Sequence, residues 1–196
     1  MPDKKGIIIG ISGASGSILG VEVLRALKQF PAIETHLVIS KLASQTFLHE
    51  TKLSLSSLKK LADYHHPINQ LSATIASGSY PFMGMIVVPC SMKTLAGIAS
   101  GYSDNLLLRA ADVCLKERRK LVIVPRETPL NGIHLRNLTF LHEQGVIILP
   151  AMMTFYHQPE TIQDMVDYLV GKILSQFDLP YAKYKTWDGN LDLKPE

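Results

Sequence analysis

Short apolar runs alternate along this chain with longer segments whose apolar residues recur at helical spacing. Five runs rich in Ile, Val and Leu are typical of strands and occupy residues 6–11, 34–40, 84–89, 121–125 and 145–150. Helices are predicted over residues 18–30, 41–50, 91–100, 105–120, 135–144 and about 160–176. The strands are apolar on both faces, as strands covered by helices on both sides are. With right-handed crossovers, this order predicts an α/β fold with a doubly wound parallel sheet of the Rossmann or flavodoxin type.

The chain has 196 residues, which fits one domain with a sizeable core. No linker, repeat or low-complexity tract divides it, so residues 1–196 are expected to form a single domain. Apolar residues make up 46% of the chain and charged residues 19%, a composition that argues against disorder. Because no apolar run is long enough for a membrane span and no signal-peptide pattern opens the chain, we expect a cytoplasmic protein without a membrane partner.

The formal net charge of +3 is small. Its densest basic run, residues 116–120, ends a predicted helix, where cations suit the helix dipole, so no nucleic-acid partner is expected. The two cysteines, Cys90 and Cys114, are too few for a disulfide framework and lack metal-ligand spacing. The histidines show no such spacing either, and no metal site is predicted.

The first expected strand leads into the sequence SGASGS at residues 12–17. Its glycines match neither the dinucleotide pattern G-x-G-x-x-G nor the nucleotide-triphosphate pattern G-K-[ST]. Ser12, Ser15 and Ser17 can add hydroxyls to free backbone amides at a helix N-terminus, which suits a single terminal phosphate such as that of FMN. Taken alone, a glycine-rich turn without a ligand fits the loop about equally well.

A second such stretch, VVPCSMKT, follows the third expected strand. Ser91 and Thr94 offer hydroxyls at another helix start, although a simple N-cap explains them too. Cys90 is expected to be a small buried residue rather than a nucleophile. We predict that the FMN phosphate lies at the Ser15 helix N-terminus and the flavin ring near residues 91–94.

The stretch PRETPL places charges directly after a buried strand. Arg126 can contact phosphate or a flavin edge, and Glu127 can move protons; a surface ion pair is the alternative.

On the predicted helix that precedes this strand, Arg109 and Asp112 are spaced for an i,i+3 pair. Apolar residues cover too much of residues 105–115 for one buried face, which predicts a subunit interface. His157 is expected to be a loop histidine rather than a base.

Several blocks of the sequence occur in the same order as in the flavin prenyltransferases, the UbiX-like family. They are GISGASG, ETHLVISK, SGS, PCSMKTLAGI, RAADVCLKERRKLVIVPRETPL and FYHQP. The chain resembles this family from about residue 6 to Trp187. The resemblance implies transfer of a dimethylallyl group from dimethylallyl phosphate to N5 and C6 of reduced FMN. The product, prenylated FMN, would serve a UbiD-type decarboxylase. A homododecamer is also implied, and we expect the tail from about residue 177 to pack on a neighbouring subunit.

The resemblance assigns three sets of residues. FMN contacts are implied for Gly13, Ala14, Ser15, Ser40, Ser91, Met92, Lys93, Thr94 and Arg126. A prenyl-phosphate site is implied for Tyr156, Lys172, Arg109 and Trp187, and catalytic roles for Glu50, Glu127, Ser15 and Lys116. Position 172 is lysine where family members usually carry arginine, so the bidentate fork is lost there.

This chemistry agrees with the residue types. Breaking an allylic C–O bond to phosphate needs cations and proton donors at the leaving group, here Lys116, Lys172, Tyr156 and Glu127. An allylic cation needs a water-poor pocket with π faces, to which Trp187 would contribute. Glu50 is the candidate base for the flavin C6 proton. Since the sequence has no carboxylate cluster of the kind that holds a magnesium diphosphate, a monophosphate donor is favoured.

Two other functions stay open at this point. One is an FMN-dependent decarboxylase of the phosphopantothenoylcysteine type, which would carry a PASANT-like block where this chain has PCSMKT. The other is a non-catalytic, flavin-binding accessory subunit of a hydroxyarylic acid decarboxylase. The mass of the product formed from reduced FMN and dimethylallyl phosphate separates all three.

Overall fold

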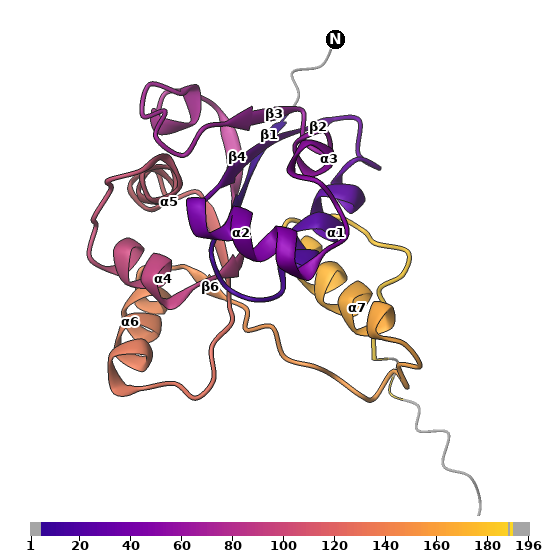
Figure 1. The fold of residues 1–196 in the computed structure, drawn as a ribbon. Helices are drawn as coiled ribbons and strands as arrows, with labels where there is room; N and C mark the ends of the chain where they lie inside the picture. The colour runs from indigo at the N-terminus through magenta and orange to yellow at the C-terminus, as the bar shows by residue number, and fades with distance from the viewer. Residues whose placement is uncertain (1–4, 188, 190–196) are drawn as a thin grey trace, which may run out of the picture.

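The computed structural model describes residues 5–187 and residue 189. Within these residues, six parallel strands form one sheet in the order β3-β2-β1-β4-β5-β6 (Figure 1). The strands are β1 (Lys5–Ile11), β2 (Ile33–Ile39), β3 (Tyr64–His66), β4 (Phe82–Cys90), β5 (Lys120–Pro125) and β6 (Ile147–Ile148). From β1 the chain adds β2 and β3 on one side, and it then crosses to add β4, β5 and β6 on the other side. The topological switch point therefore lies between β1 and β4. Sheets of this kind bind ligands at such a switch point, outside the carboxyl ends of the strands.

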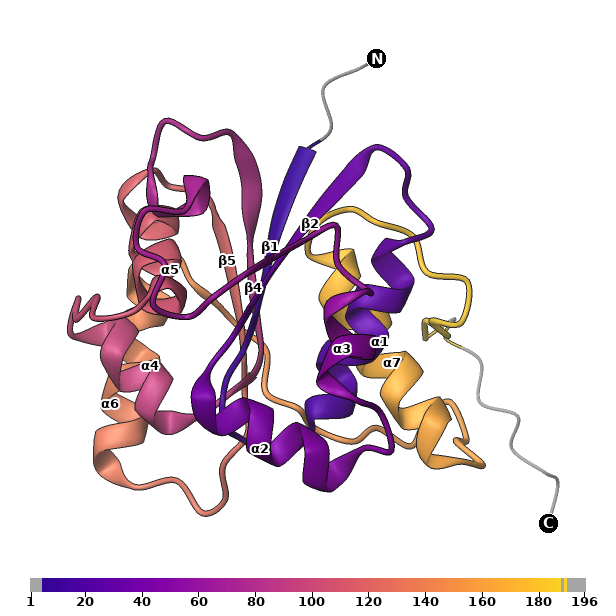
Figure 2. The same cartoon turned by 45° about the horizontal axis from the view of Figure 1, so that its top comes forward.

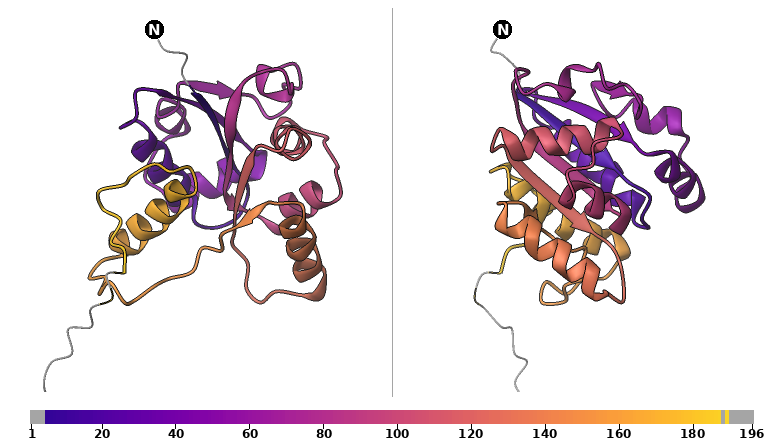
Figure 3. Two further views of the ribbon diagram at one scale, coloured as in Figure 1. Left: turned by 180° about the vertical axis from the view of Figure 1, so that it is seen from behind. Right: turned by 90° about the vertical axis from the view of Figure 1, so that its left-hand side faces the viewer.

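Helices cover both faces of the sheet (Figure 2). They are α1 (Ser17–Leu27), α2 (Lys41–Glu50), α3 (Leu55–Lys59), α4 (Met92–Ala99), α5 (Leu106–Lys116), α6 (Gly132–Glu143) and α7 (Ile162–Ser175), with a short 3-10 turn, η1 (Thr74–Ala76). Ile7 and Ile9 of β1 pack in the core shared with α1 and α7, while Ile8 packs in the core shared with α4, α5 and α6. The view from behind shows the same two layers of helices on either side of the strands (Figure 3). The predicted doubly wound α/β fold is confirmed.

The elements that the sequence did not predict are short. β3 has three residues, α3 five and η1 three, so their hydrophobic periodicity is too brief to detect. In contrast, the predicted helix over residues 105–120 was too long. α5 ends at Lys116, Arg118 adopts a positive φ of 52°, and β5 begins at Lys120.

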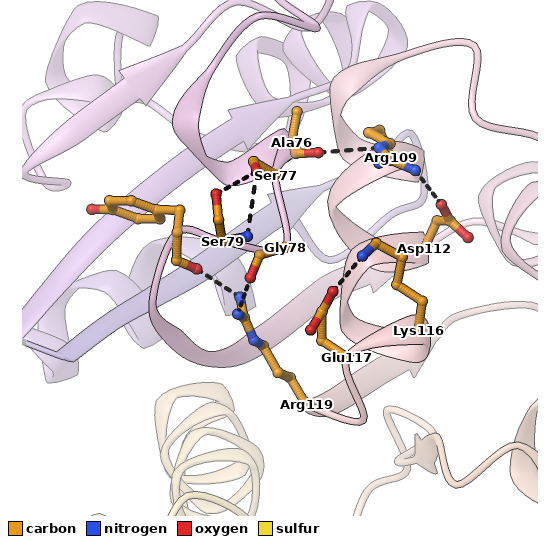
Figure 4. Close-up of polar contacts among 10 residues, drawn as sticks. Ala76, Ser77, Gly78, Ser79, Arg109, Asp112, Lys116, Glu117 and Arg119 are labelled. Atoms are coloured by element: carbon orange, nitrogen blue, oxygen red, sulfur yellow. Dashed lines mark hydrogen bonds and ion pairs between the residues drawn. The ribbon is translucent and has the colours of Figure 1, made fainter.

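The basic run at residues 116–120 therefore does not simply end a helix. The Arg119 guanidinium donates hydrogen bonds to the backbone oxygens of Gly78 (2.6 Å) and Tyr80 (2.8 Å). It also lies 4.1 Å from the ring centroid of Phe82. Figure 4 shows how this side chain holds the loop at residues 76–80 against the end of α5. Arg119 thus stabilises the fold through contacts that the sequence pattern could not indicate.

The apolar residues of α5 are buried within the chain itself. Leu106, Ala110, Ala111 and Val113 have no exposed surface. The helix packs against β4, β5, η1 and α4, which cover it on more than one side. The prediction that the apolar excess at residues 105–115 is buried between subunits was therefore wrong for these side chains.

Histidines gather on β2 and the neighbouring edge strand β3. Nδ1 of buried His36 lies 3.0 Å from Nε2 of His66, and its Nε2 lies 3.1 Å from Glu34 Oε1. The Tyr80 hydroxyl donates to the same carboxylate oxygen at 3.0 Å. Burial lowers the pKa of His36, against the opposing effect of Glu34.

In the described part of the chain, no group of three or more His, Cys, Asp or Glu residues fits a metal ion. No helix described here has the length and apolar character needed to cross a membrane.

Candidate functional site

The loop between β1 and α1 was expected to offer three serine hydroxyls to a ligand. The Ser12 hydroxyl is buried and accepts a hydrogen bond from the Ser91 N–H at 2.7 Å, so it joins the ends of β1 and β4. Ser17 is also fully buried. Gly16, the N-cap residue of α1, has a φ of 99°, which a residue without a Cβ adopts at little cost. Of the three serines, Ser15 alone is exposed.

The carboxylate of Glu50 occupies the N-terminus of α1. It accepts hydrogen bonds from the backbone N–H groups of Gly16 and Ser17, both at 3.0 Å. Burial alone would raise the pKa of Glu50, but hydrogen bonds from Ser15 and from these amides lower it below its ordinary value. A phosphate at the same helix N-terminus would face an ionised carboxylate at short range. The geometry therefore argues against the phosphate position that we expected at Ser15.

A pocket of about 490 Å³ lies at the carboxyl ends of β1, β2 and β4. This volume is within the usual range of small-molecule sites. The pocket brings together five of the residues expected to hold FMN: Gly13, Ser40, Ser91, Lys93 and Thr94. Other lining residues come from α2, α5 and the loop after β3, and include Leu42, Ile68, Asn69, Asn105 and Leu107. The expected Ala14 and Met92 are buried, each with 8% of its surface exposed.

Two helices begin at this pocket. Ser40 is the N-cap residue of α2 and Ser91 that of α4, and each hydroxyl accepts a hydrogen bond from a backbone N–H of the first turn. The next amides of both helices have no partner within their own helix, and Lys41 and Lys93 add positive charge beside them. Apolar side chains form much of the remaining wall. Amides and cations for a phosphate together with an apolar wall for a planar ring fit FMN.

Arg126 and Glu127 follow β5, the strand that pairs with β4, and neither is among the described residues that line this pocket. The Arg126 N–H donates to the backbone oxygen of Cys90 at 3.2 Å, directly before Ser91. Both charged side chains are exposed, and among the described residues Glu127 makes no ion pair. The alternative of a surface ion pair is therefore not supported.

Cys90 is fully buried, which raises its pKa to about 12 and confirms a packing residue rather than a nucleophile.

A second group of expected residues gathers beside α7. The Tyr156 ring meets the Trp187 ring edge-on, with centroids 5.5 Å apart. It meets the ring of Tyr168, a residue of α7, in the same way at 5.8 Å. Lys172 lies four residues after Tyr168 and therefore on the same face of that helix. His157, in the loop as expected, stacks on Tyr168 with centroids 5.0 Å apart.

The chain after α7 folds back along this helix. The Tyr181 hydroxyl donates to Asp167 at 2.9 Å, and Lys183 pairs with the same carboxylate at 3.4 Å. Tyr184 lies over Gly171, where a Cβ would come 2.3 Å from the Tyr184 Cβ. The described part of the tail thus packs on its own chain, while contact with a neighbouring subunit stays a prediction. Residues 188 and 190–196 lie outside the described residues.

Arg109 and Lys116 lie on α5, on the opposite face of the sheet from α7 (Figure 2). Arg109 donates to the backbone oxygen of Ala76 at 3.1 Å and pairs with Asp112 at 2.6 Å, which confirms the expected i,i+3 pair. Lys116 pairs with Glu117 (Figure 4). A single chain therefore does not bring these two cations to Tyr156 or Lys172.

Sequence reasoning missed Tyr168 and the pocket residues Ile68 and Asn69. The signal for Tyr168 was its i,i+4 spacing to Lys172. This spacing becomes informative only when a role for Lys172 is already known. Ile68 and Asn69 follow β3, and they could have been found only if this three-residue edge strand had been recognised.

Comparison with known proteins places this fold and pocket in a family. The sequence pattern of the family described as Flavoprotein matches residues 1–174. A "Probable UbiX-like flavin prenyltransferase" of Sedimentibacter hydroxybenzoicus is 52% identical over 95% of this chain and 98% of its own length. A solved structure described as a "dodecameric FMN-dependent Ubix-like Decarboxylase from Escherichia coli O157:H7" is 50% identical, with a TM-score of 0.93, and covers 94% of this chain and 100% of that one. A structure of "AnUbiX (PadA1) in complex with FMN and dimethylallyl pyrophosphate" is 47% identical, with a TM-score of 0.94, over 96% of this chain and 100% of that one. This chain belongs to the UbiX-like flavin prenyltransferases.

Proposed function

We propose that this enzyme joins the dimethylallyl group of dimethylallyl phosphate to N5 and C6 of reduced FMN. The observation that carries the proposal is the pocket at the switch point of the sheet, where two serine-capped helix N-termini meet an apolar wall. The proposal keeps the flavin ring near residues 91–94, as expected from the sequence, but changes the position of the FMN phosphate. It is placed at the N-terminus of α2, beside Ser40 and Lys41, because Glu50 already occupies the N-terminus of α1.

When bound, reduced FMN supplies the electron-rich N5 and C6 positions to which the prenyl group is attached. The chain itself supplies charge and proton transfer around them. Glu127 is exposed after β5, the strand that pairs with β4, and has no ion-pair partner among the described residues. It is assigned to proton transfer at the leaving phosphate or at N5. Ser15 and Glu50 lie together at the start of α1, and Glu50 is assigned to removal of the C6 proton. A carboxylate held by several donors is a weakened base. Glu50 has lone pairs beyond those that accept from the two amides, and one of these would take the proton.

The leaving phosphate is assigned to Tyr156 and Lys172 of one subunit and to Arg109 and Lys116 of another. Two groups on opposite faces of one sheet can serve one phosphate only if subunits share the site. Trp187, edge-on to Tyr156, would help to exclude water. We propose a homododecamer, in which the arrangement of subunits completes each site.

An exposed apolar groove supports assembly. It encloses about 620 Å³ between α4 and α6 and includes Tyr102, Ile133 and Phe140, which are 62%, 59% and 44% exposed. Lys93 lines both this groove and the FMN pocket. Exposed apolar surface of this extent is typical of protein interfaces. A second subunit seated there would therefore lie next to the flavin.

Three further parts of the proposal concern the surroundings of the reaction. The donor in this proposal is the monophosphate, as the family resemblance implies. The product is delivered to a UbiD-type decarboxylase. The enzyme works in the cytoplasm.

The proposal is tested by incubating the protein with reduced FMN and either dimethylallyl phosphate or dimethylallyl diphosphate. We expect a product whose mass equals that of FMN plus the prenyl group, formed faster from the monophosphate. Flavin binding without a mass change would instead indicate an accessory subunit. Activity on a phosphopantothenoylcysteine-type thiol acid would indicate the decarboxylase alternative.

A shared site predicts complementation between two inactive variants. Tyr156→Phe and Lys116→Ala should each prenylate FMN slowly as pure oligomers. When the two chains are co-expressed, random mixing should restore about one intact site in four. The measurement is the turnover of oligomers purified through a different tag on each chain. If mixed oligomers are no faster than the parents, Lys116 and Tyr156 do not serve one site across subunits.

A further inference from the structure

Aromatic residues occupy every third position in the tail that follows α7, at Tyr181, Tyr184 and Trp187. The function proposed above uses only Trp187, whose ring lies edge-on to that of Tyr156 with centroids 5.5 Å apart. Trp187 is 50% exposed, so the packing of its own ring does little to fix its position. The position of Trp187 therefore depends on how the preceding residues of the tail are held.

A buried carboxylate on α7 holds the first of these aromatic residues. Asp167 is only 7% exposed. It accepts hydrogen bonds from the Tyr181 hydroxyl at 2.9 Å and from the Gln163 side-chain amide at 3.1 Å, and it pairs with Lys183 at 3.4 Å. A buried charge is costly unless it is paired and hydrogen-bonded. Two of these three partners belong to the tail, so the contacts that compensate for the burial of Asp167 form only when residues 181–183 lie on α7.

The next contacts extend this attachment towards Trp187. The Tyr184 N–H donates to the Tyr181 backbone oxygen at 2.9 Å, so a turn joins the two residues. Tyr184 packs over Gly171, one helical turn further along α7, because a glycine has no Cβ to block it there. Three residues later, Trp187 reaches the Tyr156 ring. The tail is therefore bound at two successive turns of α7 before it reaches the expected prenyl-phosphate site.

We propose that Asp167 is a positioning residue of the prenyl-phosphate site, which fastens the tail to α7 so that Trp187 stays against Tyr156. The proposal rests on the function proposed above, in which Trp187 helps to exclude water from this site. Without the Asp167 contacts, the tail leaves α7 part of the time, and dimethylallyl phosphate binds well only to the fraction with Trp187 in place. At saturation the bound donor selects that fraction. Loss of Asp167 therefore raises KM and leaves kcat nearly unchanged.

The test is Asp167→Ala, which removes all three contacts and keeps a residue that favours the helix. Trp187 is the only tryptophan in the chain, so its fluorescence reports directly on the tail. In the FMN-loaded protein, the emission should shift to longer wavelength, and acrylamide should quench it more strongly than in the wild type. KM for dimethylallyl phosphate should rise roughly three- to tenfold, as for a tail in place about a tenth to a third of the time, with kcat within about twofold.

Gln163→Ala is the matched control. It removes the described partner of Asp167 that lies on α7 itself, and it leaves both contacts with the tail in place. Trp187 emission, acrylamide quenching and KM should all match those of the wild type. If this variant changes them as much as Asp167→Ala does, the effect does not pass through the tail, and the proposal is wrong.

A double variant separates positioning from simple structural support. In a Trp187→Ala background, Asp167→Ala should no longer raise KM, because the ring that it positions is gone. A full effect in that background, or unchanged Trp187 emission in Asp167→Ala, would overturn the proposal, as would changed emission with an unchanged KM.

Failure of the proposed function is distinct, because the wild-type protein would then form no prenylated product, while Trp187 emission would still report on the tail. Should Asp167→Ala not fold, Tyr181→Phe removes the hydroxyl donor from the tail instead. It should change Trp187 emission and KM in the same direction, and no change in either would count against the proposal.

Discussion

Replacing Glu127 with glutamine is expected to lower the turnover of prenylated FMN by about 10²–10⁴-fold, the usual contribution of a general acid or base. The amide keeps the size of the side chain but cannot exchange a proton at neutral pH. Glu127 is exposed and has no ion-pair partner in the described part of the chain, so its removal should not weaken the fold. FMN affinity should change little, as measured by fluorescence titration alongside the steady-state rate.

The matched control is Glu143→Gln, which makes the same change in an exposed glutamate at the end of α6. It should leave both rate and affinity unchanged. A Glu127→Gln enzyme with normal turnover at saturating FMN would remove this residue from the mechanism. Weaker FMN binding with nearly normal turnover would point to a binding role in its place.

Glu50→Gln should have two effects at once. Turnover should fall by about 10²–10⁴-fold if Glu50 removes the C6 proton. Stability should fall by about 1 kcal/mol, because a neutral amide oxygen replaces the carboxylate that accepts from the Gly16 and Ser17 amides. Urea unfolding and steady-state turnover measure the two effects separately.

Asp63→Asn provides the control for the second effect. The Asp63 carboxylate accepts from the Thr35 N–H and hydroxyl, both at 2.8 Å, near the amino end of β2 and away from the pocket. This variant should lose stability but keep its turnover. If Glu50→Gln behaves in the same way, Glu50 serves only as the cap of α1, and another base must be sought.

The acidic side of the pH dependence follows from the lowered pKa of Glu50. A carboxyl group whose pKa is lowered by folding contributes stability that is present above its unfolded pKa near 4.5 and is lost as the pH falls through the lower folded value. In the Glu50→Gln protein this contribution is absent at every pH. The stability difference between the two proteins should therefore shrink below about pH 4.

The fold could be predicted well because its strands are apolar on both faces and its longer helices have clear periodicity. Ile7, Ile8 and Ile9 alternate between the two cores, which is what a continuous apolar run in a covered sheet implies. The carboxyl ends of the strands also indicated which loops would line the pocket, as Gly13, Ser40 and Ser91 do. Periodicity failed for α5, because a helix covered on several sides by its own chain has the same pattern as one at a subunit interface.

The sequence by itself determined the α/β class, the alternation of strands and helices, and the polar loops that face the ligand, because these depend on local periodicity and on the general geometry of parallel sheets. Only the tertiary structure decided how those polar groups are used. It turned Ser12 inward, set Glu50 on the amides of α1, brought the Tyr168 ring edge-on to Tyr156, and put Arg109 and Lys116 across the sheet from α7. Such pairings join residues far apart in the chain, and hydrogen bonding and packing in three dimensions select them rather than any repeat in the sequence.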